Sequence, residues 1–133
     1  MTLQHASIEL KLTKAKSLLA EVPILLENKF NITAINRLYY ACYHATRALL
    51  LTKNIMPKTH KGVVIMLQKH FVLEKLLDEK YGALYSTLME ERMDDDYSDY
   101  LSVDEETIRE FTLFANEYIP IIEILIKQHG SNK

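Results

Sequence analysis

The sequence predicts an all-α protein, and three observations support this fold class. Apolar residues recur at the three- and four-residue spacing of a helix in several long stretches. Only three glycines and three prolines occur in 133 residues, and alternating β-branched runs are nearly absent. The content of 48% hydrophobic and 26% charged residues is ordinary for a globular protein. A chain of this length can bury a core as a single domain over residues 1–133.

Five helical segments are predicted, and the first two account for over a third of the chain. The first covers Thr2–Asn28, and Pro23 is expected to kink or divide it because proline lacks the backbone donor of a helical turn. The second covers Asn31–Lys53, with Asn31 as its N-cap. A turn over Asn54–Thr59 is expected to end this first half.

The remaining three helices are predicted from capping signals and apolar spacing. Thr59 is expected to cap a short helix that ends near Lys69, and the next helix covers about Leu73–Met93. Ser102 followed by Glu105 has the pattern of a capping box, which opens a last helix over Val103–Gln128. No internal repeat or second domain is apparent.

The second helix is the most informative element. On a helical wheel at about 100° per residue, apolar residues cover most of its circumference. A stripe of small residues, where another backbone could approach closely, consists of Ala34, Ala41, Ala45 and Ala48. The polar stripe consists of Thr33, Asn36, Arg37, Tyr40, His44 and Arg47. A surface helix usually has a wider charged face, so this helix is expected to be central, with its polar stripe facing a cleft or a partner.

Three residues of the polar stripe form a candidate site. Arg37, Tyr40 and His44 lie side by side at spacings of three and four. A cation, a phenol and an imidazole can bind a phosphodiester, and a histidine with an arginine can also cleave one. The structural alternative is that Arg37 and His44 form hydrogen bonds or a salt bridge within the bundle.

The acidic segment after Arg92 is a weaker candidate. Asp94–Glu105 places oxygen-bearing side chains at several ligand positions of an EF-hand loop, but the sixth position is Asp99, where the turn requires glycine. A solvated helix end, with one aspartate paired to Arg92, is favoured instead. The histidines outside the second helix show no metal-ligand spacing, and His60 is expected to serve in helix capping. No metal and no cofactor are therefore expected.

Charge and cysteine content restrict the class of protein further. A net charge of −2 argues against indiscriminate nucleic-acid binding, although a local basic site inside a dimer groove stays open. The single cysteine, Cys42, is expected to be a small core residue in a reducing compartment. No stretch reaches the roughly 18 apolar residues of a membrane span, and no signal peptide is apparent. A cytoplasmic protein without membrane association is expected.

Three blocks of the sequence resemble one family. The stretch A-I-N-R-L-Y-Y-A-C-Y-H-A-T-R-A-L-L (Ala34–Leu50) resembles the hallmark helix of small bacterial and archaeal HEPN-domain proteins, in the branch that carries N-R-x-Y-Y-A-x-F-H-A. P-K-T-H-K-G-V (Pro57–Val63) resembles the segment that follows in that branch. E-R-M-D-D-D-Y (Glu91–Tyr97) resembles its later R-x-x-x-D-Y signature.

This resemblance implies an up-and-down bundle of four to five helices that usually forms a homodimer. Such domains are commonly encoded beside a minimal nucleotidyltransferase, often as a toxin–antitoxin pair. Many relatives in other branches are metal-independent endoribonucleases. Their active site is an arginine and a histidine four to six residues apart, brought together from two protomers across the dimer cleft.

The match at that nuclease motif is imperfect. Arg92 is followed by Asp96 and Tyr97, and no histidine occurs within six residues of it. Arg37 and His44 have the six-residue gap, but they lie on the earlier helix. Either both regions share one cleft, or this branch has lost or altered catalysis.

The leading hypothesis is a cytoplasmic homodimer that binds or cleaves RNA, as the toxin of a two-component system. The residues that contact phosphate would be Arg37, His44 and Arg92. The residues that support them or bind substrate would be Tyr40, Arg47, Asp96 and Tyr97. The alternative is a non-catalytic module that binds a nucleotide or the nucleotidyltransferase partner.

Overall fold

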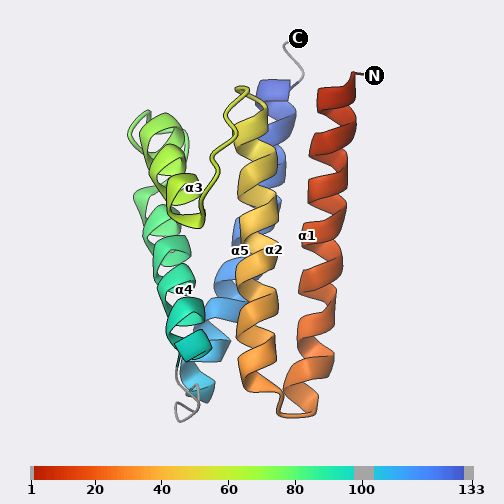
Figure 1. Ribbon diagram of the computed structural model, residues 1–133, viewed down its shortest axis with the longest axis vertical. Coiled ribbons are helices and arrows are strands. Elements are labelled where there is room, and N and C mark those ends of the chain that lie inside the picture. Colours follow the sequence, from red (N-terminus) through yellow and green to blue (C-terminus); the bar gives the residue numbers. More distant parts are fainter. Residues whose placement is uncertain (1, 98–103, 131–133) are drawn as a thin grey trace.

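The computed structural model describes residues 2–97 and 104–130, and of residues 92–97 and 130 the backbone alone. The elements are α1 (Leu3–Glu27), α2 (Asn31–Leu51), α3 (His60–Leu67), the π-helical turn η1 (Gln68–Val72), α4 (Glu79–Tyr97) and α5 (Glu105–Gly130). The described residues contain no strand. Helices α1, α2, α4 and α5 alternate in direction, so α1 begins at the end of the bundle where α5 ends (Figure 1). The predicted all-α bundle is confirmed.

Helix α2 is the centre of the bundle. It packs against α1, α3, α4 and α5, and α1 lies beside it along its length (Figure 1). Its small-residue stripe is completely buried, as close helix approach requires: Ala34, Ala41, Ala45 and Ala48. Cys42 is also buried, and burial raises the pKa of its thiol, so it is an unreactive core residue as expected.

Three helical segments end in the same way. Lys29, Asn54 and Lys75 adopt left-handed backbone conformations, with φ of 59°, 60° and 61°. In each case the following amide donates back to the carbonyl five residues earlier, with N–O distances of 2.9, 3.1 and 2.9 Å. This pattern is the Schellman motif, which satisfies the last carbonyls of a helix. Lysine rarely occupies the left-handed position, so the sequence signal at two of these ends is weak.

Several predicted boundaries are corrected. Pro23 does not divide α1, which continues to Glu27. The proline is exposed, and Leu26 in the turn beyond it packs on the core and holds that turn in place. Asn31 is the first residue of α2 rather than its cap, and the preceding residue makes no side-chain cap. The fourth helix begins at Glu79, since the Lys75 turn ends the preceding segment. The predicted Thr59 cap is confirmed: its hydroxyl accepts from the Gly62 amide at 2.9 Å.

A buried hydroxyl chain crosses the core between α2 and α5. The Thr46 hydroxyl donates to the Cys42 carbonyl at 2.7 Å, and the Tyr118 hydroxyl lies 2.6 Å from it as donor. The Tyr85 ring stacks on Tyr118 at 6.0 Å, but its buried hydroxyl makes no hydrogen bond with the described residues. Burial, and then the nearby Tyr39, raise the Tyr85 pKa.

These two tyrosines should respond oppositely to loss of the hydroxyl. Tyr118→Phe is expected to lower the free energy of unfolding by about 1 kcal/mol, because a buried hydrogen bond is lost. Tyr85→Phe is expected to leave it unchanged or raise it, because an unpaired hydroxyl leaves the core. Urea unfolding followed by circular dichroism measures both. A larger loss for Tyr85→Phe than for Tyr118→Phe would contradict this account.

Candidate functional site

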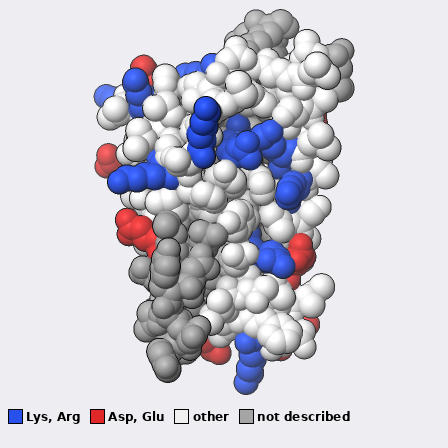
Figure 2. All heavy atoms as spheres, viewed as in Figure 1, with Lys and Arg blue, Asp and Glu red and all other residues white. Residues whose placement is uncertain are grey.

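His44 lies at the centre of a concentration of positive charge. It is half-buried on α2, and its pKa is lowered to about 4 by burial first, and then by Lys14, Arg47, Lys11 and His60. At pH 7 the imidazole is therefore neutral. We call Lys11, Lys14, His44 and Arg47 the basic cluster. On this face, Lys and Arg side chains gather in the half nearer the start of α1 and the end of α2 (Figure 2).

No carboxylate neutralises the basic cluster among the described residues. The described residues contain two ion pairs, Lys16–Glu123 at 2.7 Å and Arg37–Glu21 at 3.0 Å. Neither pair includes a residue of the basic cluster. The Lys11 ammonium donates to the Ser7 hydroxyl at 2.8 Å. Burial, and then Arg47, lower the Lys11 pKa. Cations close enough to lower the pKa of a neighbouring basic group in this way would be stabilised by an anion bound between them.

An aromatic cluster adjoins the basic cluster and includes a residue that sequence reasoning assigned elsewhere. The His60 ring stacks on Tyr43 with 4.4 Å between centroids, and its Nδ1 lies 2.5 Å from the Tyr39 hydroxyl. Tyr40 contacts both His44 and His60 through its ring, at 6.2 and 5.8 Å. Thr59 provides the helix cap, so His60 instead fixes the aromatic cluster beside His44.

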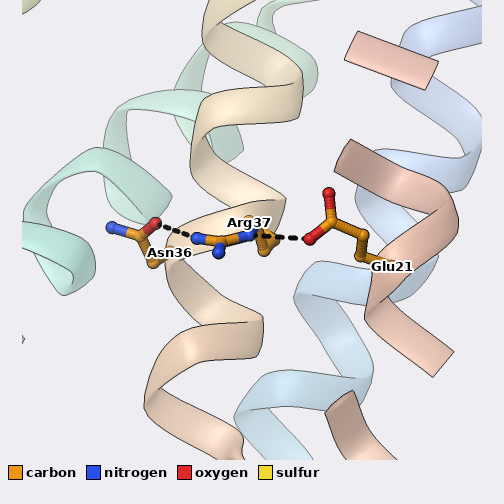
Figure 3. Close-up of polar contacts among 3 residues, drawn as sticks. All are labelled: Glu21, Asn36 and Arg37. Carbon is orange, nitrogen blue, oxygen red and sulfur yellow. Dashed lines mark hydrogen bonds and ion pairs between the residues drawn. The ribbon is translucent and has the colours of Figure 1, made fainter. Parts of the chain in front are cut away.

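Arg37 does not belong to the basic cluster. Its Nε donates to Glu21 Oε1 of α1 at 3.0 Å, and its Nη1 donates to the Asn36 side chain at 3.0 Å (Figure 3). It lies seven positions before His44 on α2, which is about 10 Å along the helix axis. Partly exposed pairs of this kind contribute about 0–1 kcal/mol, so an incoming phosphate could compete with Glu21 for the guanidinium.

The other predicted site residues divide into two groups. Tyr40 and Arg47 are placed beside His44, and the Arg47 guanidinium lies 5.4 Å from the Tyr43 ring centroid. The side chains of Arg92, Asp96 and Tyr97 lie outside the described residues, as does most of the Asp94–Glu105 segment. The helical backbone at these positions belongs to the last turns of α4, at the end of the bundle where α2 begins (Figure 1).

Sequence reasoning missed Lys11, Lys14 and His60. The spacing of Lys11 and Lys14 places both on one side of α1, but which side meets α2 depends on tertiary packing. The signal for His60 was its place within the P-K-T-H-K-G-V block. Over residues 2–91 and 104–129, whose side chains are described, no group of three potential metal ligands occurs. No helix in the described ranges is long and apolar enough to cross a membrane.

The position of His44 makes stability depend on pH. Its pKa is about 4 in the folded chain against 6.5 ordinarily, so between these values the unfolded chain takes up a proton that the folded chain does not. The free energy of unfolding should therefore fall as pH drops from 6.5 to 4. Because the ring is half-exposed and screened by solvent, we expect a loss of about 1–2 kcal/mol rather than the full shift.

His44→Gln should remove this part of the pH dependence. Urea unfolding at several pH values gives the difference between wild type and variant, which cancels the carboxylates that titrate in the same range. His5→Gln, at a half-buried position of α1 outside the basic cluster, is the matched control for the loss of a histidine. Equal slopes for wild type and His44→Gln would show that His44 titrates alike in both states.

Fold and site together define a helical-bundle protein with a basic cluster on one face, and comparison with known proteins supplies its family. The sequence model of the HEPN domain matches residues 8–125. A UPF0332 protein from Thermotoga maritima is 30% identical over 114 residues, which are 86% of each chain. Two Methanocaldococcus jannaschii proteins, "Putative toxin MJ0605" and "Putative toxin MJ0142", are 40% and 31% identical over 69% and 74% of this chain and 69% and 67% of their own.

The chain therefore belongs to the HEPN domain family.

Proposed function

We propose that this chain is a toxin-type HEPN protein that binds RNA through the basic cluster and cleaves it without a metal ion. The observation that carries the proposal is a neutral imidazole surrounded by Lys11, Lys14 and Arg47, with no carboxylate paired to them among the described residues. RNA presents regularly spaced phosphates that such a cluster can neutralise. The names of the two Methanocaldococcus relatives support the toxin role.

The cleavage that fits this site is an internal transesterification. His44, whose pKa a bound phosphate would raise, would take the proton of an RNA 2′-hydroxyl, whose oxygen attacks the adjacent phosphorus while the bond to the 5′-oxygen breaks. The imidazolium of His44, directly or through water, would then return this proton to the leaving 5′-oxygen. The products would be a 2′,3′-cyclic phosphate and a 5′-hydroxyl end. Arg37 and Arg92 would stabilise the charge that develops on the phosphate. Since Arg37 lies two turns from His44 on one helix, the proposal includes a homodimer in which a second copy completes the site.

Cleavage in the presence of a chelator tests this proposal. The purified chain is incubated with mixed RNA and excess EDTA, as wild type and as the variants His44→Ala, Arg37→Ala and Arg92→Ala. We expect cleavage by wild type and about 10²-fold or greater loss in the His44 variant, as for removal of a general base. His5→Ala is the control and should cleave normally. Wild-type cleavage that survives His44→Ala would overturn the assignment, and no wild-type cleavage would leave RNA binding alone to be tested.

A second candidate function is a module that binds a protein partner such as a minimal nucleotidyltransferase. The outer side of α1 favours it, because Leu3, Leu10 and Ile24 stand on one line of the helix, 91%, 70% and 63% exposed. Their separations are multiples of seven residues, as on a helix that packs against another helix. Three large apolar side chains exposed in a row are unusual on a face that meets only water.

Measurement of mass by light scattering, alone and with the nucleotidyltransferase, tests the second candidate. Leu10→Lys should abolish the complex if this side of α1 carries it, and the substitution leaves the core intact because Leu10 is exposed. Leu113→Lys, at an exposed position of α5, is the control. A complex that survives Leu10→Lys would place the contact elsewhere.

A further inference from the structure

A pocket adjoins the basic cluster at the end of the bundle where α1 begins and α2 ends. It encloses about 360 Å³, and Lys11 and Arg47 form part of its wall. Leu3, Met56 and Pro57 provide apolar surface in the same wall. Two cations beside an apolar surface are the features that a nucleotide requires, with its phosphate on the cations and its base against the apolar side chains.

The pocket also contains a pair of carboxamides whose orientations are fixed. Gln4 Nε2 donates to the Leu51 carbonyl and to Asn54 Oδ1, both at 2.6 Å. Because a carbonyl can only accept, the Leu51 contact determines which atom of Gln4 is nitrogen. Gln4 Oε1 then stands as an acceptor and Asn54 Nδ2 as a donor, and both residues line the pocket.

We propose that this pocket is a base-binding subsite selective for a base whose Watson–Crick edge carries an amino group beside an acceptor ring nitrogen, namely adenine or cytosine. The exocyclic amino group donates to Gln4 Oε1, and the ring nitrogen accepts from Asn54 Nδ2. In nucleic-acid complexes a single side-chain amide recognises adenine with its own oxygen and nitrogen; here the acceptor and the donor would come from two amides that are hydrogen-bonded to each other. Uracil presents the reverse pattern at this edge. Its binding would require Gln4 to turn its oxygen toward the Leu51 carbonyl, which leaves two acceptors facing each other.

The basic cluster links the base subsite to the phosphate site. Lys11 and Arg47 belong both to the cluster around His44 and to the pocket wall. The phosphate they hold is therefore attached to the nucleotide whose base enters the pocket. The subsite rests on the proposed RNA function, and it adds a preference for the base next to the bound phosphate.

Binding of four small probes to the full chain, followed by NMR titration, tests the subsite. The probes are AMP, CMP, UMP and ribose 5-phosphate, which has a phosphate and no base. We expect AMP and CMP to bind roughly tenfold more tightly than UMP, in line with one paired amide contact, and ribose 5-phosphate to bind most weakly because it also lacks the apolar contact. Arg47→Gln should weaken all four.

Asn54→Gly removes the amide without strain, because Asn54 occupies the left-handed position of a Schellman motif, which glycine favours. This variant should bind AMP, CMP and UMP with the same affinity, close to that of wild type for UMP. Lys75→Gly makes the same backbone change at another helix end and should retain the preference. Equal binding of the three nucleotides that Arg47→Gln still weakens would overturn the subsite and leave the phosphate site standing. Binding that Arg47→Gln does not change would overturn both.

Discussion

Replacing Lys11, Lys14 and Arg47 together by glutamine is expected to weaken the binding of single-stranded RNA by about hundredfold at low salt. Each cation that contacts a phosphate releases counterions, so the slope of log affinity against log salt should become shallower by about 2 for three contacts. Fluorescence anisotropy with a labelled oligonucleotide over a range of salt concentrations measures both quantities. His44→Gln should leave the slope nearly unchanged, because the wild-type histidine and the glutamine that replaces it are both neutral at pH 7.

The control for this triple variant changes the same net charge elsewhere. Lys69, Lys80 and Lys127 lie outside the basic cluster, on η1, α4 and α5. Their replacement by glutamine should alter affinity only slightly, because exposed charges beyond about 10 Å are screened at 0.1 M salt. If both triple variants lost the same affinity, RNA binding would depend on net charge rather than on the basic cluster.

Leu38→Ala is expected to lower the free energy of unfolding by about 2–5 kcal/mol. Leu38 is fully buried on α2, the helix that packs against every other α-helix of the bundle. Loss of its side chain leaves a cavity in a closely packed core, which the surrounding structure can fill only in part. Chemical unfolding in urea measures the loss.

Leu113→Ala is the matched substitution for Leu38→Ala. Leu113 is 63% exposed on α5, so the same truncation should cost less than about 0.5 kcal/mol. Comparable losses in the two variants would mean that α2 does not form the centre of the core. A change in the urea dependence of either variant would point instead to an altered unfolded state.

The helices were predictable because their signals are local. Apolar spacing identified each long helix, and Thr59 was expected to cap α3. The structure places the cap at this residue, where the Thr59 hydroxyl accepts from the Gly62 amide. The end of the first helix was predicted to within one residue. The turn at Lys75 was not predictable from residue type, since lysine enters the left-handed region only where surrounding contacts stabilise it. The fourth helix consequently begins six residues later than the apolar pattern suggested.

The candidate site was only partly predictable because it depends on which face of α1 is turned toward α2. Periodicity placed Arg37 and His44 on one stripe, but the ion pair with Glu21 is a contact between helices. The lysines that lower the His44 pKa also come from α1. A helical wheel shows which residues share a face, and it does not show which face of a neighbouring helix lies opposite.

The central position of α2 has a consequence for how this protein can diversify. The same helix carries His44 and Arg47 on one side and a fully buried alanine stripe on another. Most substitutions on α2 will therefore affect stability before they affect ligand choice. The start of α1 and the Asn54–Pro57 connection also line the pocket but contribute little to the core. New ligand preferences can arise in these two segments at low cost, while α2 is restrained by its packing.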